Sequence, residues 1–302
     1  MVAILEQEKA ERRLHDSPSV NWWGIVQYGL MAIACLYLYV PVLTMLVADW
    51  WDDPDYSHGF LVPVLAAYFV WRRRQKLAEA VPQSSWWGIG VLLIGILMLI
   101  LGNIGAELFL MRSSMIVVIV GLVLYHLGGQ HLKLLASPIA FLLFMIPLPA
   151  ILLNAITLPL QLLAARLSTF SLQFVGLPVY REGNIIFLPR TTLEIIEACS
   201  GLRSLMSLLA LGVVFAYMTQ RHTWKRVLLV VSAVPIALIA NAFRIWGTGV
   251  LAHFYGTQVA EGFYHTFAGW VVFVVAFALL AIEGLALSHL HFKAMHPRRI
   301  PR

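Results

Sequence analysis

Residues 227–247 read VLLVVSAVPIALIANAFRIWG, and Arg244 is the one formally charged residue among them. A helix that rises about 1.5 Å per residue crosses the hydrocarbon core of a bilayer in about 20 residues, so this run is long enough to span a membrane. The rest of the chain has the same character, because 60% of its 302 residues are hydrophobic and only 12% are charged. A soluble domain carries roughly twice that share of charge. The composition therefore excludes a soluble globular protein and predicts a polytopic membrane protein.

Hydropathy indicates eight candidate spans, and we predict an all-α membrane protein with about eight transmembrane helices. The runs lie near 22–47, 59–71, 86–103, 108–126, 132–148, 202–219, 227–247 and 263–287. The run at 59–71 is short for a complete crossing. We retain it as a short or partly embedded span, because removing it would place Arg72, Arg73 and Arg74 outside the cell.

Basic residues give the expected orientation. With both termini in the cytoplasm, 15 of the 21 Lys and Arg residues fall inside, while the outer loop at 49–55 is acidic. The six remaining arginines are Arg112, Arg166, Arg181, Arg190, Arg203 and Arg244. We therefore expect a cytoplasmic segment at 1–21, a membrane domain at 22–290 and a basic cytoplasmic tail at 291–302. No small-residue cleavage site follows the first apolar run, which we expect to remain as an anchor. The basic run at 72–76 and the tail are predicted to set topology and to contact anionic lipids.

The segment 149–199 departs from this succession of spans. Its first part, about 150–175, contains Pro159 and Arg166 and suits an interfacial or re-entrant helix. Its second part has β-prone runs at 179–181, 185–188 and 192–196, with a turn at 182–184. Open sheet edges are not tolerated in hydrocarbon, so we predict a small β-element on the outer side. Glu182, Glu194, Glu197 and Arg181 could bind a ligand there or could form a solvated edge.

Two cysteines are too few for a disulfide framework, and Cys35 suits a small apolar filler. No CxxC, HExxH or zinc-type Cys/His spacing occurs, so we expect no metal and no cofactor.

Three reactive residue types share one predicted depth at the outer ends of the last three spans. Cys199 precedes the sixth run, Arg244 ends the seventh and His265 begins the eighth. A thiolate is a nucleophile, an imidazole exchanges protons, and a guanidinium stabilises a thiolate or an oxyanion. Each residue also has a simpler explanation. Cys199 could be a packing residue, His265 a helix cap, and Arg244 a side chain that snorkels to the interface.

Four further residues are candidates for supporting roles. Arg203 could tune Cys199 or pair with an acid or a lipid phosphate. Asn241 lies three residues before Arg244 on the same helix face and could orient its guanidinium. Tyr56 and His58 lie at the outer end of the second span, where a loop-to-helix junction would explain them nearly as well.

These residues carry a family resemblance. The blocks at 198–204 (ACSGLRS) and 241–245 (NAFRI), together with His265, resemble the exosortase/archaeosortase family of integral membrane cysteine transpeptidases. The segment YSHG at 56–59 resembles the family's early part. The resemblance covers most of the chain, from the second span to the eighth.

The resemblance implies a protein-sorting enzyme of the bacterial inner membrane. Its substrates would be membrane-anchored proteins with a C-terminal signal made of a Pro-Glu-Pro motif, a transmembrane helix and a basic cluster. Cleavage would occur at the outer face, with Cys199 as nucleophile, His265 as general acid/base and Arg244 as stabilising cation. The second nucleophile is left open between water and an acceptor amine or hydroxyl, and no nucleic acid is expected as a partner.

Two other classes of function fit the span count. A transporter would place ionisable residues near the bilayer midplane, whereas here they gather at the outer leaflet. A non-catalytic scaffold of an exopolysaccharide export system would tolerate loss of the Cys199 thiol.

Overall fold

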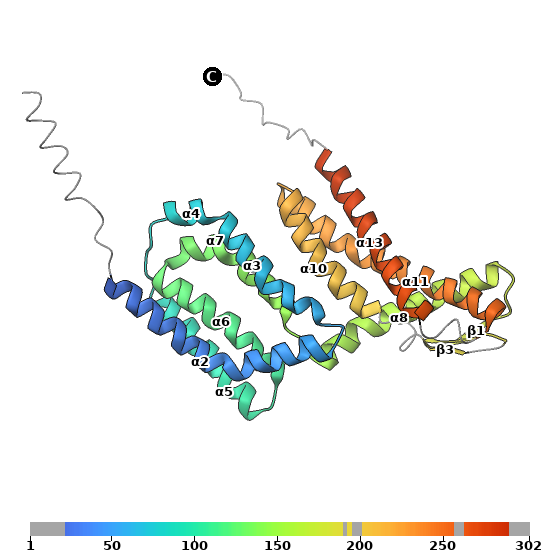
Figure 1. Cartoon of the computed structure of the whole chain (residues 1–302), viewed down its shortest axis with the longest axis horizontal. Helices are drawn as coiled ribbons and strands as arrows, with labels where there is room; N and C mark the ends of the chain where they lie inside the picture. The colour runs from blue at the N-terminus through green and yellow to red at the C-terminus, as the bar shows by residue number, and fades with distance from the viewer. Residues whose placement is uncertain (1–21, 190–191, 195–200, 257–262, 290–302) are drawn as a thin grey trace, which may run out of the picture. The chain divides into compact units, whose positions relative to one another are not determined.

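The computed structural model describes residues 22–189, 192–194, 201–256 and 263–289, which form a mostly helical chain with one small sheet (Figure 1). The elements in chain order are α2 (Trp22–Asp52), η1 (Ser57–Phe60), α3 (Leu61–Arg72), α4 (Arg74–Glu79), α5 (Trp87–Ile104), α6 (Leu108–His126), α7 (Gly128–Phe141), η2 (Leu142–Met145), α8 (Ala150–Phe174), β1 (Tyr180–Glu182), β2 (Ile185–Phe187), β3 (Thr192–Glu194), α10 (Gly201–Thr219), α11 (Thr223–Tyr255) and α13 (Phe263–His289).

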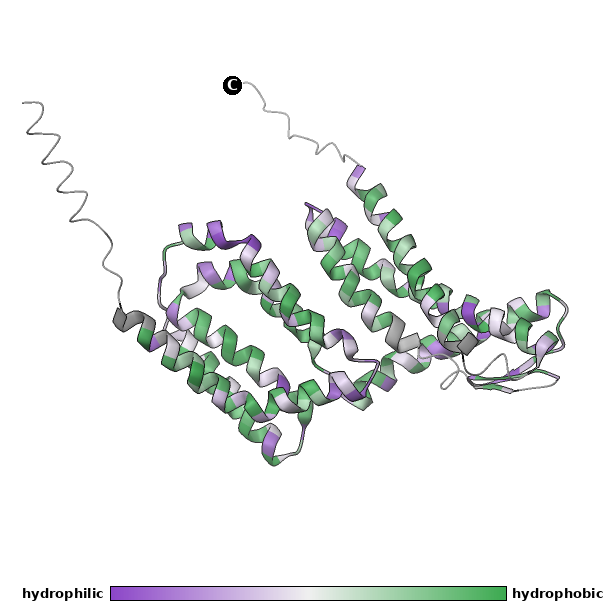
Figure 2. Cartoon of the chain, viewed as in Figure 1, coloured by the Kyte–Doolittle hydropathy of each residue, from purple (hydrophilic) through white to green (hydrophobic). Residues whose placement is uncertain are grey.

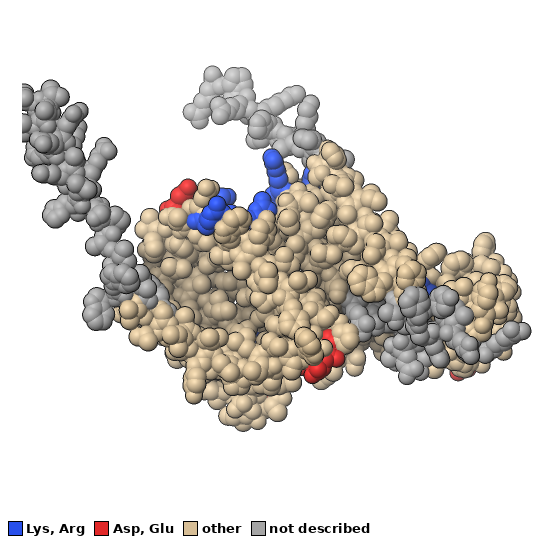
Figure 3. Space-filling view, in the orientation of Figure 1, with Lys and Arg blue, Asp and Glu red and all other residues tan. Residues whose placement is uncertain are grey.

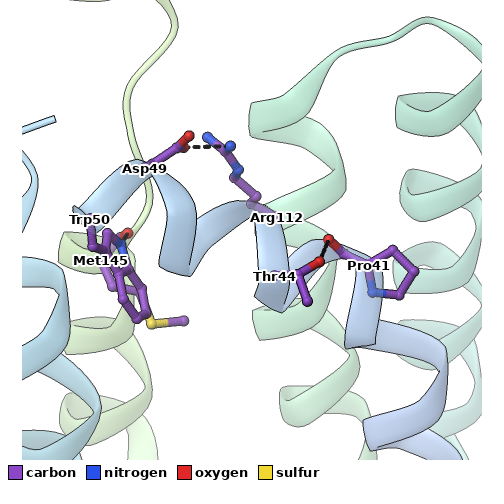
Figure 4. A network of polar contacts seen from close by, with 6 residues as sticks. All are labelled: Pro41, Thr44, Asp49, Trp50, Arg112 and Met145. Atoms are coloured by element: carbon purple, nitrogen blue, oxygen red, sulfur yellow. Dashed lines mark hydrogen bonds and ion pairs between the residues drawn. The ribbon is translucent and has the colours of Figure 1, made fainter. Parts of the chain in front are cut away.

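The chain divides within α2 into two compact units, residues 1–45 and 46–302. In the first unit α2 passes through Pro41 without ending, and the hydroxyl of Thr44 donates a hydrogen bond of 2.8 Å to the Pro41 carbonyl (Figure 4). The remaining elements belong to the second unit.

Six helices of the described chain are long and apolar enough to cross a membrane, and a shorter apolar helix lies at Leu205–Thr219. The six are Gly29–Asp52, Trp87–Ile104, Leu108–His126, Ala150–Phe174, Thr223–Tyr255 and Phe267–His289. Hydrophobic residues cover these helices over most of their length (Figure 2). The prediction of a mostly helical, multi-pass membrane protein is confirmed.

The individual helices differ from the predicted runs in three places. The runs at 59–71 and 132–148 form α3 and α7, helices of 12 and 14 residues that are too short to rank among the six. The run at 132–148 is interrupted because Pro147 and Pro149 follow η2 and supply no backbone N–H to continue a helix. Conversely, α8 has the length and apolarity of a span, although its segment suits an interfacial or re-entrant helix by sequence.

Glycines allow α5 and α6 to pack closely. The buried residues of α5 are Gly88, Gly95 and Gly102, which recur every seven residues and so lie on one face. A Cβ added at Gly95 would lie 2.6 Å from the Val118 side chain of α6, and one added at Gly88 would lie 2.3 Å from the Tyr125 backbone nitrogen. Small residues thus bring the two backbones together, as is common between membrane helices.

The small β-element predicted from sequence is present as an antiparallel sheet of order β1-β2-β3, and its position on the outer side stays a prediction. Tyr180 pairs with Phe187, and their rings stack at 4.6 Å between centroids. Gly183 has a φ of +60°, which suits the tight turn between β1 and β2. Ile186 of the central strand is completely buried and belongs to a core cluster with α8 and Ile245 of α11. The sheet is therefore packed against α8 and against α11, the helix that carries Arg244.

In the view of Figure 3, basic side chains gather on the side that carries α4 and the α10–α11 turn, with one acidic group beside them at α4, and another acidic group lies on the opposite side. The cytoplasmic placement of the basic side stays a prediction.

Candidate functional site

The structure places part of the predicted catalytic set. Arg244 is described in full on α11 and is half-buried. His265 lies in the first turn of α13 and Arg203 in the first turn of α10, and for both the description is limited to the helix. Cys199 lies outside the described residues, two positions before α10 begins.

Polar contacts fix the antiparallel register of α11 and α13. The Lys225 amine donates a hydrogen bond to the Leu287 carbonyl, and the Ser232 hydroxyl donates one of 2.6 Å to the carboxylate of Glu283. As α11 proceeds toward its C-terminus, its partners on α13 therefore move toward the N-terminus of that helix.

The same register brings the Arg244 guanidinium onto the second turn of α13. A Cβ built at Gly269 would lie 3.3 Å from Nη2 of Arg244 and 3.4 Å from its Cζ, so the guanidinium lies against the bare Cα of this glycine. His265 precedes Gly269 by four residues, and residues four apart in a helix lie on one face, one turn from each other. The position of His265 on the helix is therefore one turn from the guanidinium.

A small cavity connects the start of α10 with α11. It has a volume of about 30 Å³, and its lining includes Leu205 of α10 with Asn241 of α11. Thr157 and Gln161 of α8 add polar groups to its wall, and the volume admits a water molecule. One turn before Leu205 lies Gly201, two residues after Cys199, and three residues after Asn241 lies Arg244. The start of α10 is thus brought to the part of α11 that carries Arg244.

Asn241 is buried, and it lines this cavity. The structure therefore places it between α8 and α10. Its predicted role of orienting the Arg244 guanidinium remains a prediction.

Tyr56 and His58 make their described contacts with the turn that follows α7. His58 Nε2 lies 3.1 Å from the Phe144 carbonyl, which accepts a hydrogen bond from it. Burial lowers the pKa of His58 below its usual value, and the carbonyls of Phe144 and Asp55 oppose this in part. Burial, followed by the nearby Asp53 carboxylate, raises the pKa of Tyr56. These contacts hold the start of α3 against residues 144–148, whereas the contacts of Arg244 described above are with α13.

A buried ion pair was not predicted from the sequence. Arg112, in the second turn of α6, lies 2.5 Å from the carboxylate of Asp49, and its side chain is only 5% exposed (Figure 4). In the same region Trp50 Nε1 donates a hydrogen bond of 2.8 Å to the Met145 carbonyl. An arginine in an apolar run needs an acidic partner, and the acidic segment at 49–55 was the signal that could have indicated one. The pair joins the end of α2 to α6 and is a structural feature.

Within the described residues, no three His, Cys, Asp or Glu side chains gather as a metal site.

Comparison with known proteins identifies the family. Residues 50–282 match the family described as "Transmembrane exosortase (Exosortase_EpsH)". No curated protein and no solved structure matches the chain. The matched segment covers more than half of the sequence and includes the ACSGLRS block, Arg244 and His265. The chain therefore belongs to the transmembrane exosortase family.

Proposed function

We propose that this exosortase is a membrane-embedded cysteine protease or transpeptidase that cleaves C-terminal sorting signals at the outer face of the bacterial inner membrane. Its catalytic residues would be Cys199, His265 and Arg244. The observation that carries the proposal is the contact of the Arg244 guanidinium with Gly269, one helical turn after His265.

Helix lengths support a shared depth for these groups. Arg226 lies near the start of α11 at the basic end, and 20 residues later, about 30 Å along the helix, comes Trp246. The Lys225 amine bonds to Leu287 on α13, and 20 residues before Leu287 comes Phe267. Arg244 and His265 each lie two residues from these points. A hydrocarbon core that begins at the basic end would therefore end close to both.

The proposed chemistry follows from the three side chains. His265 removes the proton from the Cys199 thiol, and the thiolate attacks the scissile carbonyl to form a tetrahedral oxyanion. Arg244 stabilises the negative charge. Collapse breaks the C–N bond, His265 protonates the leaving amine, and an acyl thioester remains on Cys199. Water, or an acceptor amine or hydroxyl, then attacks the thioester and regenerates the thiol.

A substrate that is already anchored in the bilayer would enter sideways between helices. Its basic cluster on the cytoplasmic side and its cleavage motif on the outer side would be separated by the membrane thickness. The bilayer itself would then align the motif with Cys199.

Processing of a tagged substrate tests the proposal, and the chain supplies a matched control. In membranes that contain Cys199→Ala we expect only precursor, whereas Cys35→Ala, which alters the half-buried cysteine of α2, should process normally. An unchanged ratio of precursor to product in Cys199→Ala would favour a transporter or a scaffold of an exopolysaccharide export system. Arg244→Lys should also accumulate precursor, because an ammonium does not reproduce the planar fork of a guanidinium.

A further inference from the structure

Two arginines from distant parts of the sequence meet around one tyrosine at the basic end of the molecule. The guanidinium carbon of Arg73, which follows α3, lies 5.2 Å from the ring centroid of Tyr217 in α10. That of Arg226 in α11 lies 5.0 Å from the same ring. Such distances are typical of cation–π contacts. Tyr217 therefore contacts two positive charges, one from α11 and one from the residue that follows α3.

Backbone carbonyls position both guanidinium groups. Arg226 Nε donates a hydrogen bond of 2.8 Å to the Gln220 carbonyl, and Gln220 is fixed by its own hydrogen bond of 2.6 Å to the Gly284 carbonyl. Arg73 Nη1 donates to the Leu134 carbonyl of α7. Each arginine is half-buried, and no carboxylate of the described residues forms an ion pair with either. Each keeps further N–H donors for an anion.

An apolar groove begins at one of these charges, that of Arg226. It has a volume of about 360 Å³ and runs between α7, α10 and α11. Arg226 and Tyr217 belong to its lining, and the rest is almost entirely hydrophobic, including Phe141, Phe144 and Val230. The site is thus amphipathic, with a cationic end and an apolar length.

We propose that this groove binds an anionic glycerophospholipid, with the phosphate between Arg73 and Arg226 and an acyl chain along the groove. Guanidinium groups recognise phosphate through paired N–H donors, and the apolar walls replace the surrounding lipid around the chain. The positive charge of Arg73 and Arg226 favours a lipid over the helix of the proposed substrate. The basic cluster of that helix would lie at this same end and would be repelled. This comparison of occupants rests on the proposed function, whereas lipid binding itself is measured without proteolytic activity.

Lipid binding to the purified full-length protein in a neutral detergent tests the proposal. The probes are phosphatidylglycerol and phosphatidylcholine, which share acyl chains, and the readout is native mass spectrometry of the retained lipid. We expect the wild type to retain phosphatidylglycerol at least tenfold more strongly than phosphatidylcholine. Arg226→Gln and Arg73→Gln should each reduce that retention about tenfold. Inorganic phosphate should not compete, because it lacks the chain.

The matched control is Arg221→Gln, which removes one positive charge from an exposed residue of the α10–α11 turn that does not line the groove. It should leave retention within about twofold of the wild type. Ala140→Trp, at an exposed position of the groove lining, should reduce retention without any change of charge. Equal losses in the Arg221 and Arg226 variants would overturn the proposal, because only general surface charge would then be involved. Unchanged retention in Ala140→Trp, or in both Arg73→Gln and Arg226→Gln, would also overturn it.

Discussion

Gly269 is the position at which a small substitution should act directly on Arg244. An added Cβ would lie 3.3 Å from Nη2, 3.4 Å from Cζ and 3.5 Å from Nη1 of that guanidinium. Ordinary contacts of a Cβ fall at 3.4–4 Å, so Gly269→Ala requires the guanidinium to move by a few tenths of an ångström. Gly269→Leu extends farther into the same space and should displace it by more than about 1 Å.

The expected loss of activity follows from the size of this displacement. A misplacement of about 1 Å in a group that positions or stabilises the reacting atoms costs about a hundredfold in rate. We therefore predict a severalfold decrease in processing for Gly269→Ala and a decrease of about a hundredfold for Gly269→Leu. The free energy of unfolding should not fall in Gly269→Ala, because alanine is favoured over glycine in a helix by about 1 kcal/mol.

The assay is the ratio of precursor to processed tagged substrate, measured together with the amount of enzyme in the membrane. Gly247 of α11 is the matched control, because a Cβ added there would meet no atom within 4 Å. Gly247→Ala should process normally and gain the same helix propensity. Wild-type processing by Gly269→Leu at a normal enzyme level would refute the role assigned to the position of Arg244.

Three further predictions concern stability and pH. Gly59→Ala should lower the free energy of unfolding by at least about 1–3 kcal/mol, because its Cβ would lie 2.3 Å from Nε1 of Trp50 and would break the buried indole hydrogen bond. An unchanged thermal transition in detergent would contradict this prediction. Gly95→Leu should separate α5 from α6 and lower the thermal transition temperature. Gly90→Leu is the control, because a Cβ there would meet no atom within 4 Å, and it should leave that temperature unchanged. Equal transition temperatures for the two variants would exclude the proposed glycine packing. Because burial lowers the pKa of His58, the unfolded chain takes up its proton more readily, so stability should fall as the pH drops below about 6.5 and level off below the folded-state pKa. His58→Gln should make that loss between pH 7 and 5 smaller, and an identical pH profile for wild type and variant would exclude the effect.

Much of the fold follows from hydrophobicity and local propensity. The long apolar runs became helices, and the β-prone segments around the turn at 182–184 became a three-stranded sheet. Both patterns depend on neighbours in the sequence, which is why they could be predicted. The length of α8 could not be predicted from sequence, because Pro159 and Arg166 weaken its apolar pattern. Packing of α8 against α11 stabilises the helix.

The candidate site was predictable in part for a different reason. Membrane thickness relates sequence position to depth, so Arg244 and His265 could be expected near one level. The contact of Arg244 with Gly269, and the ion pair of Arg112 with Asp49, depend on which helices are neighbours and on their rotation. Hydropathy contains no information on either.

The most direct test of the proposed mechanism is mass spectrometry of enzyme trapped during turnover of a sorting-signal substrate. Digestion of the trapped protein should yield the peptide that contains Cys199 joined through a thioester to the upstream part of the substrate. A hydroxylamine-sensitive mass increase at Cys199, and none at Cys35, is the predicted result. Complete processing with no adduct at Cys199 in the trapped enzyme, or with the adduct at another residue, would contradict the account.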